Sequence, residues 1–202
     1  MLSKKGAMFG LDARIALAIF GALSVISGAA LYSAIKDARV VSAVNQLDEL
    51  SKAYVAHFLD TGEHLSEYLV SPNFLLGKEL VENSQSLVGW SGPYWTAGYG
   101  SNYNSSDTLG RIAFQPYNAA SFLQATNNDW GAFSGATTAE TCTVTNCHVW
   151  AYVEFRDDES IELAKSINEK IDMDNDGGKG KVRVREFGDG TYNIYYYVQP
   201  KQ

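Results

Sequence analysis

The chain contains little proline and little cysteine, and it has no excess of positive charge. Only four of its 202 residues are proline, and none precedes Pro72. The formal net charge is −7, so the chain lacks the positive excess with which nucleic-acid binders neutralise phosphates. Hydrophobic residues make up 46% and charged residues 19%, which excludes a disordered chain and a multi-span membrane protein. We expect a folded protein that does not bind nucleic acid.

The helix breakers that are present lie mostly in the second half. The 18 glycines are concentrated after residue 85. We therefore expect a helical front and a back that is rich in loops and strands. The length suits one ordinary domain with an extra element.

Cysteine is limited to Cys142 and Cys147, in the string CTVTNC. With only His148 beside them, they are too few for a zinc site, which needs four ligands. Their spacing allows a small disulfide loop. A disulfide implies an oxidising compartment, whereas the alternative is a pair of reduced thiols in a cytosolic loop. We favour the disulfide because of the N-terminal segment.

That segment, residues 15–35, reads IALAIFGALSVISGAALYSAI and contains no charge. At about 1.5 Å per residue, a helix of this length spans roughly 31 Å, the thickness of a bilayer core. Arg14 and Lys36 flank it. Lys4, Lys5 and Arg14 on its short side predict a cytoplasmic N-terminus with the rest of the chain outside.

Three interpretations of this N-terminus compete. A cleaved secretory signal has a shorter apolar core and a small-residue cleavage site after it, whereas this run is long and continues into further helix. A plain membrane anchor stays open. So does a leader that is cut before the apolar run, which leaves the run in the mature protein.

The string MLSKKGAMFGLDARIALAIFGALSVI resembles the N-terminus of type IV pilins and type II secretion pseudopilins. That family has a short basic leader ending in glycine, then an acidic residue within the first turns, then a long apolar helix. Here the leader is MLSKKG and the acidic residue is Asp12. The resemblance implies a leader of residues 1–7, cleavage at Gly6, Ala7 or Met8, and methylation of the new N-terminus.

The resemblance also implies how the chain assembles. Asp12 would pair with the freed N-terminal amine of a neighbouring subunit, since a carboxylate near the bilayer core is costly unless paired. The local alternative is that Asp12 sits at the membrane edge and pairs with Arg14, Lys4 or water. The implied partners are other pilin-like subunits in a homo- or hetero-oligomeric filament, a prepilin peptidase, an inner-membrane platform protein and an assembly ATPase.

The periodicity after residue 35 continues the helix. Apolar residues recur at the three-to-four spacing of one helix face, namely Ala38, Val41, Val44, Leu47, Leu50, Tyr54 and Phe58. We predict one helix over 8–60, membrane-spanning at about 15–35 and ending at Thr61-Gly62. His57 and His64 are expected to be surface residues rather than a metal site.

Residues 61–202 are predicted to form a globular head. We expect a short helix at 63–70 and another from Ser71-Pro72, with proline at the first helical position, to about Glu82. The string HVWAYVEF at 148–155 predicts a strand, and SIELAKSINEKI a helix capped by Asp157 or Asp158. Segments 182–187 and 191–198 predict a hairpin over Gly188-Asp189-Gly190. The expected fold is α+β and pilin-like, a long N-terminal helix packed on a small antiparallel sheet.

The region 85–148 is rich in glycine and aromatic residues, and we predict that it is a loop region. Its string GWSGPY at 89–94 resembles a W-x-G-P-Y segment of many pseudopilins, and Trp90 and Tyr94 are expected to pack on the helix. The other aromatic residues either build the core of the head, which we favour, or bind a sugar or a partner.

The string DMDNDG at 172–177 has the alternating acids and the glycine that begin an EF-hand loop. The twelfth position, which should be glutamate, is Arg183. The segment also resembles a late turn of minor pilins, some of which bind calcium. Asp172, Asp174 and Asp176 are therefore candidate calcium ligands, although we favour a solvated acidic turn.

No pattern typical of an enzyme is present: there is no nucleophile elbow and no phosphate-binding loop. The function expected is that of a structural subunit, a pilin or pseudopilin. It would lie in the inner membrane with its head in the periplasm before assembly, and in a periplasmic or cell-surface filament afterwards. The alternative is a singly anchored periplasmic or surface binding module whose aromatic-rich loop holds a ligand.

Overall fold

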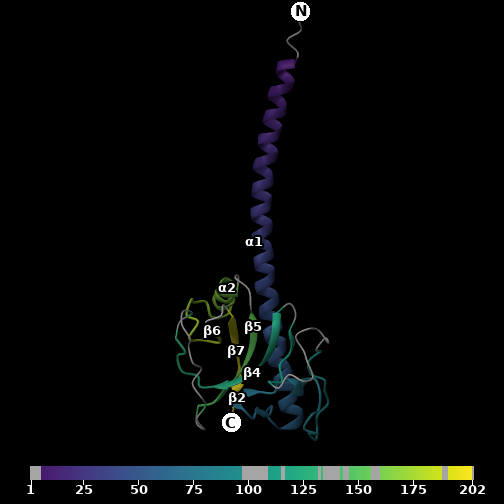
Figure 1. Ribbon diagram of the computed structural model, residues 1–202, viewed down its shortest axis with the longest axis vertical. Helices are drawn as coiled ribbons and strands as arrows, with labels where there is room; N and C mark the ends of the chain where they lie inside the picture. The colour runs from purple at the N-terminus through teal and green to yellow at the C-terminus, as the bar shows by residue number, and fades with distance from the viewer. Residues whose placement is uncertain are drawn as a thin grey trace, which may run out of the picture. The chain divides into compact units, whose positions relative to one another are not determined.

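The computed structural model describes most of the chain, namely residues 6–96, 109–114, 117–131, 133, 142, 146–155, 160–187 and 191–201. Its elements are α1 (Gly6–Thr61), β1 (Glu67–Tyr68), β2 (Ser71–Leu75), the 3₁₀ helix η1 (Gly77–Leu80), β3 (Ile112–Phe114), β4 (Tyr117–Ala125), β5 (His148–Phe155), α2 (Ser160–Asp172), β6 (Val182–Glu186) and β7 (Tyr192–Pro200) (Figure 1). The chain divides into two compact units, 1–41 and 42–202; α1 begins in the first and ends in the second.

The predicted end of the long helix is confirmed. Gly62 has a φ of +73°, a conformation that a helix cannot continue through and that glycine adopts without strain. Its N–H donates to the carbonyl of Phe58 at 2.8 Å, and the Thr61 hydroxyl donates to the carbonyl of His57. These bonds satisfy carbonyls that the helix end would otherwise leave unpaired.

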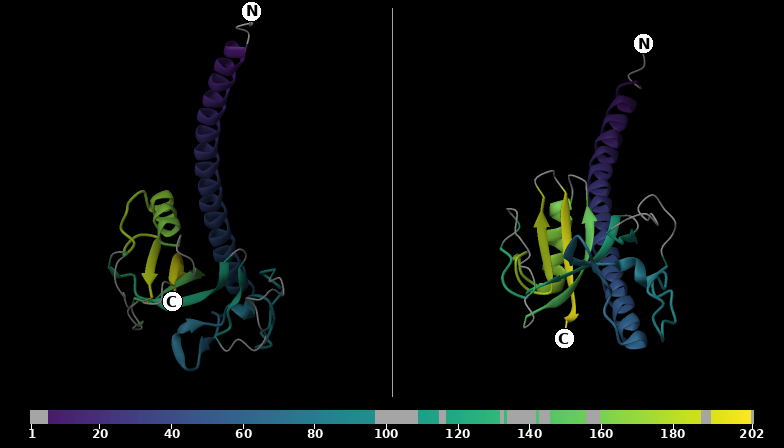
Figure 2. Two further views of the ribbon diagram at one scale, coloured as in Figure 1. Left: turned by 45° about the horizontal axis from the view of Figure 1, so that its top comes forward. Right: turned by 60° about the horizontal axis from the view of Figure 1, so that its bottom comes forward.

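The head is built on one antiparallel sheet in the order β1-β2-β4-β5-β7-β6, with β3 also paired to β4. The green and yellow strands β5, β7 and β6 lie side by side in Figure 2. The ladder is continuous through its centre, where Phe122 pairs with Ala151 and Val153 pairs with Ile194. The predicted α+β class with a long N-terminal helix packed on an antiparallel sheet is confirmed.

One face of this sheet is covered by helices. Phe122 and Val153 lie on that face, and both are buried. The ring of Tyr54, from the second half of α1, packs against Phe122 with centroids 5.1 Å apart. The helix α2 packs beside it on β6 and β7, burying Ala164 and Ile167. Because successive side chains of a strand point to opposite faces of the sheet, every second residue of these strands faces the helices.

The opposite face carries the aromatic core. Trp150 of β5 and Tyr195 of β7 are buried there, and Trp130 from the loop after β4 packs on both, at 4.9 and 5.3 Å. The Arg183 guanidinium lies over Trp130 and Trp150, with its carbon 4.7 and 4.4 Å from their ring centroids. It donates to the carbonyls of residues 127 and 128, which holds this loop on the sheet.

Two predicted helices are wrong. Residues 63–66 are irregular and lead into β1, and the segment from Ser71 forms the strand β2 followed by η1 rather than one helix. Each predicted helix is only a few turns long, and short isolated helices are marginal. As a strand, the second segment instead pairs Leu75 with Phe122 and buries Leu75 completely.

The other predicted elements of the head are confirmed. The strand at 148–155 is β5, and the following helix is α2. The predicted hairpin is formed by β6 and β7, with Val184 opposite Ile194. Its turn, Gly188-Asp189-Gly190, and the predicted caps, Asp157 and Asp158, lie outside the described residues.

Candidate functional site

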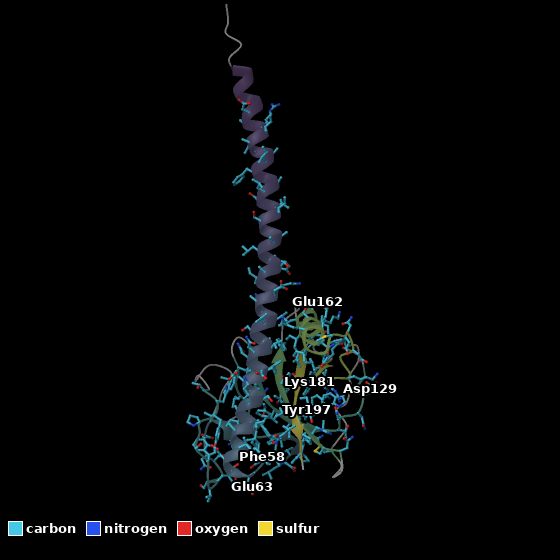
Figure 3. The ribbon with its side chains drawn as sticks, turned by 180° about the vertical axis from the view of Figure 1, so that it is seen from behind. Phe58, Glu63, Asp129, Glu162, Lys181 and Tyr197 are labelled. Atoms are coloured by element: carbon cyan, nitrogen blue, oxygen red, sulfur yellow. A yellow bond between two sulfur atoms is a disulfide. The ribbon has the colours of Figure 1, made fainter. Side chains whose placement is uncertain are left out.

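Within the part of the chain that the structure describes, most exposed large apolar side chains lie on the first half of α1. Every described side chain from residue 12 to residue 39 is exposed, and side chains stand out around the helix in Figure 3. Soluble monomers rarely expose an apolar surface of this extent, so it needs a lipid or protein partner. By length and composition this helix can cross a membrane. The large apolar side chains on it are Ile15, Leu17, Ile19, Phe20, Leu23, Val25, Ile26, Leu31, Tyr32 and Ile35.

The C-terminal end of the apolar run has the side chains typical of a membrane interface. The Lys36 ammonium lies over the ring of Tyr32, 5.1 Å from its centroid. Tyrosine is enriched where hydrocarbon meets headgroups, and lysine extends its charge towards water from such a position. Arg14 is the charged residue at the other end of the run. The uncharged length between these two cations suits a single span.

The residues of the predicted processing and assembly site lie at the start of α1. Gly6, Ala7 and Met8 belong to its first turns. Asp12 is exposed, and it follows Met8 by four positions in the sequence. Asp12 therefore lies in α1 between the predicted cleavage site and the apolar run of residues 15–35.

The predicted packing of the GWSGPY segment on the helix is confirmed for Tyr94, whereas packing of Trp90 on the helix stays a prediction. Tyr94 donates a hydrogen bond from its hydroxyl to Asp60 Oδ2 at 3.0 Å, and the Ser91 hydroxyl donates to the same oxygen. These two bonds lower the pKa of Asp60. A Cβ at Gly89 would lie 2.2 Å from the Asp60 carbonyl oxygen, so only glycine lets the loop approach the helix this closely. Trp90 donates its indole N–H to the carbonyl of Glu79.

The prediction that His57 is a surface residue is wrong. Its side chain is buried on the helix face that meets the head, against the edge of the Tyr94 ring at 5.5 Å. Within the described part of the chain, neither ring nitrogen has a hydrogen-bond partner. Burial lowers its pKa, and the nearby charges of Glu79 and Asp60 oppose that shift only in part. The lowered pKa favours the neutral form of the His57 imidazole. His64 is half-buried and contacts Tyr54 through its Nδ1, 2.7 Å from the hydroxyl oxygen.

The acidic turn uses its carboxylates to organise its own backbone. Asp172 accepts the N–H groups of Lys181 and Val182 at 3.0 and 2.8 Å. Asp174 accepts the side-chain amide of Asn168 and the N–H of Asp176. In turn, Asp176 accepts the N–H of Gly178 and pairs with Lys179.

These contacts bear on the calcium prediction. Among the described residues, no group of three or more His, Cys, Asp or Glu side chains is arranged to hold a metal ion. Asp172, Asp174 and Asp176 each have protein partners instead, as expected of a structural turn. Calcium binding by these three residues stays a prediction.

One sequence prediction, the disulfide, remains to be placed, and the structure adds two shallow depressions. The predicted disulfide between Cys142 and Cys147 is present.

A groove of about 390 Å³ lies between Gln46 and Glu49 of α1 and the aromatic residue Trp95. A second depression lies beside Asp129, Lys181 and Tyr197, which Figure 3 shows on one side of the head. There Lys179 forms an ion pair with Asp129 at 3.0 Å.

No protein-family model, curated protein or solved structure matches this chain. Functional inference therefore depends on the residues and geometry described above.

Proposed function

We propose that this protein is a membrane-anchored structural subunit of pilin type, which assembles into a filament through the first half of α1. The observation that carries the proposal is the division of one uninterrupted helix into two parts. Its first part is apolar and exposed all round, and its second part supplies core residues to the head, among them Leu47, Leu50 and Tyr54. No proline or glycine lies between residues 29 and 61 to separate them.

This division distinguishes a filament subunit from a plain anchor on physical grounds. An anchor only has to hold a domain near a membrane, and a flexible linker does so adequately. In this chain one helix continues from the apolar segment into residues of the core of the head, with no linker sequence between them. That property is useful when many copies must pack in register around a common helical core.

The proposal includes a location and partners. The basic residues ahead of the apolar run, Lys4, Lys5 and Arg14, favour a cytoplasmic N-terminus and a head outside the inner membrane. The disulfide fits the oxidising compartment in which that head would fold. Assembly would need a prepilin peptidase, a platform protein and an ATPase, and would give a filament of pilin-like subunits.

An assembly experiment tests the proposal. Asp12→Ala is expected to abolish or strongly reduce filament yield in cells that carry the assembly proteins, without reducing membrane insertion. The matched control is Asp37→Ala, which removes an exposed acid from the same helix outside the apolar run. Equal filament yields from Asp12→Ala and the wild type would contradict the pairing role.

A second function has one observation in its favour. The groove beside Trp95 also contains Asn45, Gln46, Glu49 and Thr96, a mixture of aromatic and polar groups that suits a sugar or a peptide. A singly anchored binding module would use this groove and keep its N-terminus intact. It would form no filament, so the experiment above separates the two functions.

A further inference from the structure

A lysine, a glutamine and a glutamate from three distant parts of the chain meet at one end of the sheet. Gln124 belongs to β4, Glu67 to β1, and Lys201 directly follows β7. The strand ladder explains their meeting, because β4 is joined through β5 to the end of β7 and through β2 to β1. They are separated in sequence by 57, 77 and 134 residues.

The amine of Lys201 contacts both of the other side chains. Its Nζ lies 2.9 Å from Glu67 Oε1, and it donates a second hydrogen bond to Gln124 Oε1. The same Glu67 oxygen accepts a hydrogen bond from Gln124 Nε2 at 2.9 Å. The Gln124 amide nitrogen also donates to the carbonyl of Pro72. Glu67 Oε1 thus accepts hydrogen bonds from both the Lys201 amine and the Gln124 amide nitrogen. The Lys201 amine also contacts the Gln124 amide directly, through its oxygen.

The three groups are held by the backbone of the sheet. Gln124 is only 6% exposed, and the Lys201 side chain is 18% exposed. The N–H of Lys201 donates to the carbonyl of Cys147 at 2.8 Å, which fixes the end of β7 beside the start of β5. Two reacting groups that a fold holds in a productive orientation react as if each were present at an effective concentration on the order of 10⁵–10⁸ M.

We propose that Lys201 and Gln124 form an intramolecular isopeptide bond, with Glu67 as the proton-transfer group. The neutral amine of Lys201 attacks Cδ of Gln124, and a bond forms between Nζ and Cδ. The bond between Cδ and Nε2 breaks. Glu67 takes a proton from the amine and delivers it to Nε2, which leaves as ammonia. The step needs no oxidant or reductant, and the chain loses the mass of one ammonia molecule.

The surroundings of Glu67 suit this role. Hydrogen bonds from Lys201 and Gln124 lower the pKa of Glu67. A lowered pKa makes its carboxylate a weaker base, so the assigned role depends on its position between the two nitrogens. A general base must lie within hydrogen-bond reach of the proton that it takes, and both relevant nitrogens are within that reach. The unreacted form of the same cluster is an ion pair with two amide hydrogen bonds, and it differs from the product in mass and in connectivity.

Peptide mapping of the purified full-length protein distinguishes the two forms. The protein is held folded at pH 7 and at pH 9, then denatured, reduced and digested with trypsin. The isopeptide joins the tryptic peptide of residues 112–156, which contains Gln124, to the peptide of residues 186–202. Trypsin does not cut after an acylated lysine, so the C-terminal peptide keeps Gln202. Because only the neutral amine attacks, the joined peptide is expected to accumulate faster at pH 9.

The result that overturns the proposal is equally direct. A wild-type protein that gives only the separate peptide 186–201, at both pH values, contains an ion pair and no isopeptide. This readout depends neither on the N-terminus nor on filament formation, so it can fail independently of the proposed function.

Two variants test the roles within the cluster. Lys201→Arg keeps the positive charge but removes the nucleophilic amine, and Glu67→Gln removes the proton-transfer group, so both are expected to lose the joined peptide. Lys170→Arg, at an exposed position of α2, is the matched control and should cross-link like the wild type. Full cross-linking in Glu67→Gln would contradict the assigned role of Glu67. The wild-type result stands even if a variant does not fold.

Discussion

Tyr54 and Phe122 pack with their ring centroids 5.1 Å apart, and this contact joins the second half of α1 to the central strand β4. Both side chains are completely buried. The long helix therefore contributes to the core of the head as well as carrying the apolar segment.

Leu50→Ala is expected to destabilise the head by about 2–5 kcal/mol, because truncating a buried leucine loses transfer free energy and leaves a cavity. Leu50 is fully buried on the helix face that meets the sheet. The matched control is Leu59→Ala, at a position 75% exposed, where little change is expected. Urea unfolding of both variants measures the difference. Equal free energies of unfolding would show that the second half of α1 does not belong to the folded head.

The stability of the head is expected to fall as the pH drops below about 6.5. Burial lowers the pKa of His57, and it also lowers the pKa of His64 and His148. For a base with a lowered folded-state pKa, the unfolded chain takes up protons that the folded chain does not bind. Stability is therefore complete above the unfolded pKa and is lost as the pH falls below it.

The variant His57→Leu isolates the contribution of His57. It is expected to reduce the loss of stability between pH 7 and pH 5, and to cost little at pH 8, because neither ring nitrogen makes a hydrogen bond with a described group. Free energies of unfolding at several pH values check both expectations. An unchanged pH dependence would mean that His57 titrates in the folded head as it does in the unfolded chain.

Arg183→Lys is expected to destabilise the head by about 2–4 kcal/mol, since an ammonium cannot reproduce planar stacking and several directed hydrogen bonds at once. Arg183 lies over two tryptophan rings and donates to the backbone of the loop at 127–128. The control Lys170→Gln removes an exposed positive charge and should stay within about 0.5 kcal/mol of the wild type. Thermal unfolding followed by tryptophan fluorescence suits this comparison because it reports on the same rings.

The acidic turn should depend on Asp172 through hydrogen bonding. Asp172→Ala leaves the N–H groups of Lys181 and Val182 without their acceptor and is expected to cost about 1–3 kcal/mol. Melting curves with calcium and with a chelator provide the separate test of metal binding. A calcium-dependent rise in melting temperature that disappears in Asp174→Asn would establish the calcium site, whereas identical curves would leave the turn purely structural.

The elements predicted correctly are those with strong local patterns. The long helix has no breaker from residue 29 to residue 61, and HVWAYVEF is rich in strand-forming residues. By contrast, the central strand β4, YNAASFLQA, has no β-branched residue and was assigned to the loop region. It is a strand because β2 and β5 pair with it on both sides. That pairing is a property of the whole fold.

The residues of the candidate sites also differ in whether a local sequence pattern predicts their environment. The burial of His57 has a local signal, since it continues the spacing of Leu47, Leu50 and Tyr54 along one helix face. Phe58, which the predicted face included instead, is only partly buried. No local signal exists for the cluster of Glu67, Gln124 and Lys201, because only the sheet brings these residues together.

The most direct test of the proposed function is the N-terminal mass of the protein isolated from its native membrane. Processing by a prepilin peptidase predicts a chain that begins at Ala7 or Met8 and carries an added methyl group on its N-terminal amine. A chain that begins at Met1 and keeps Lys4 and Lys5 would contradict the pilin proposal and favour the anchored binding module.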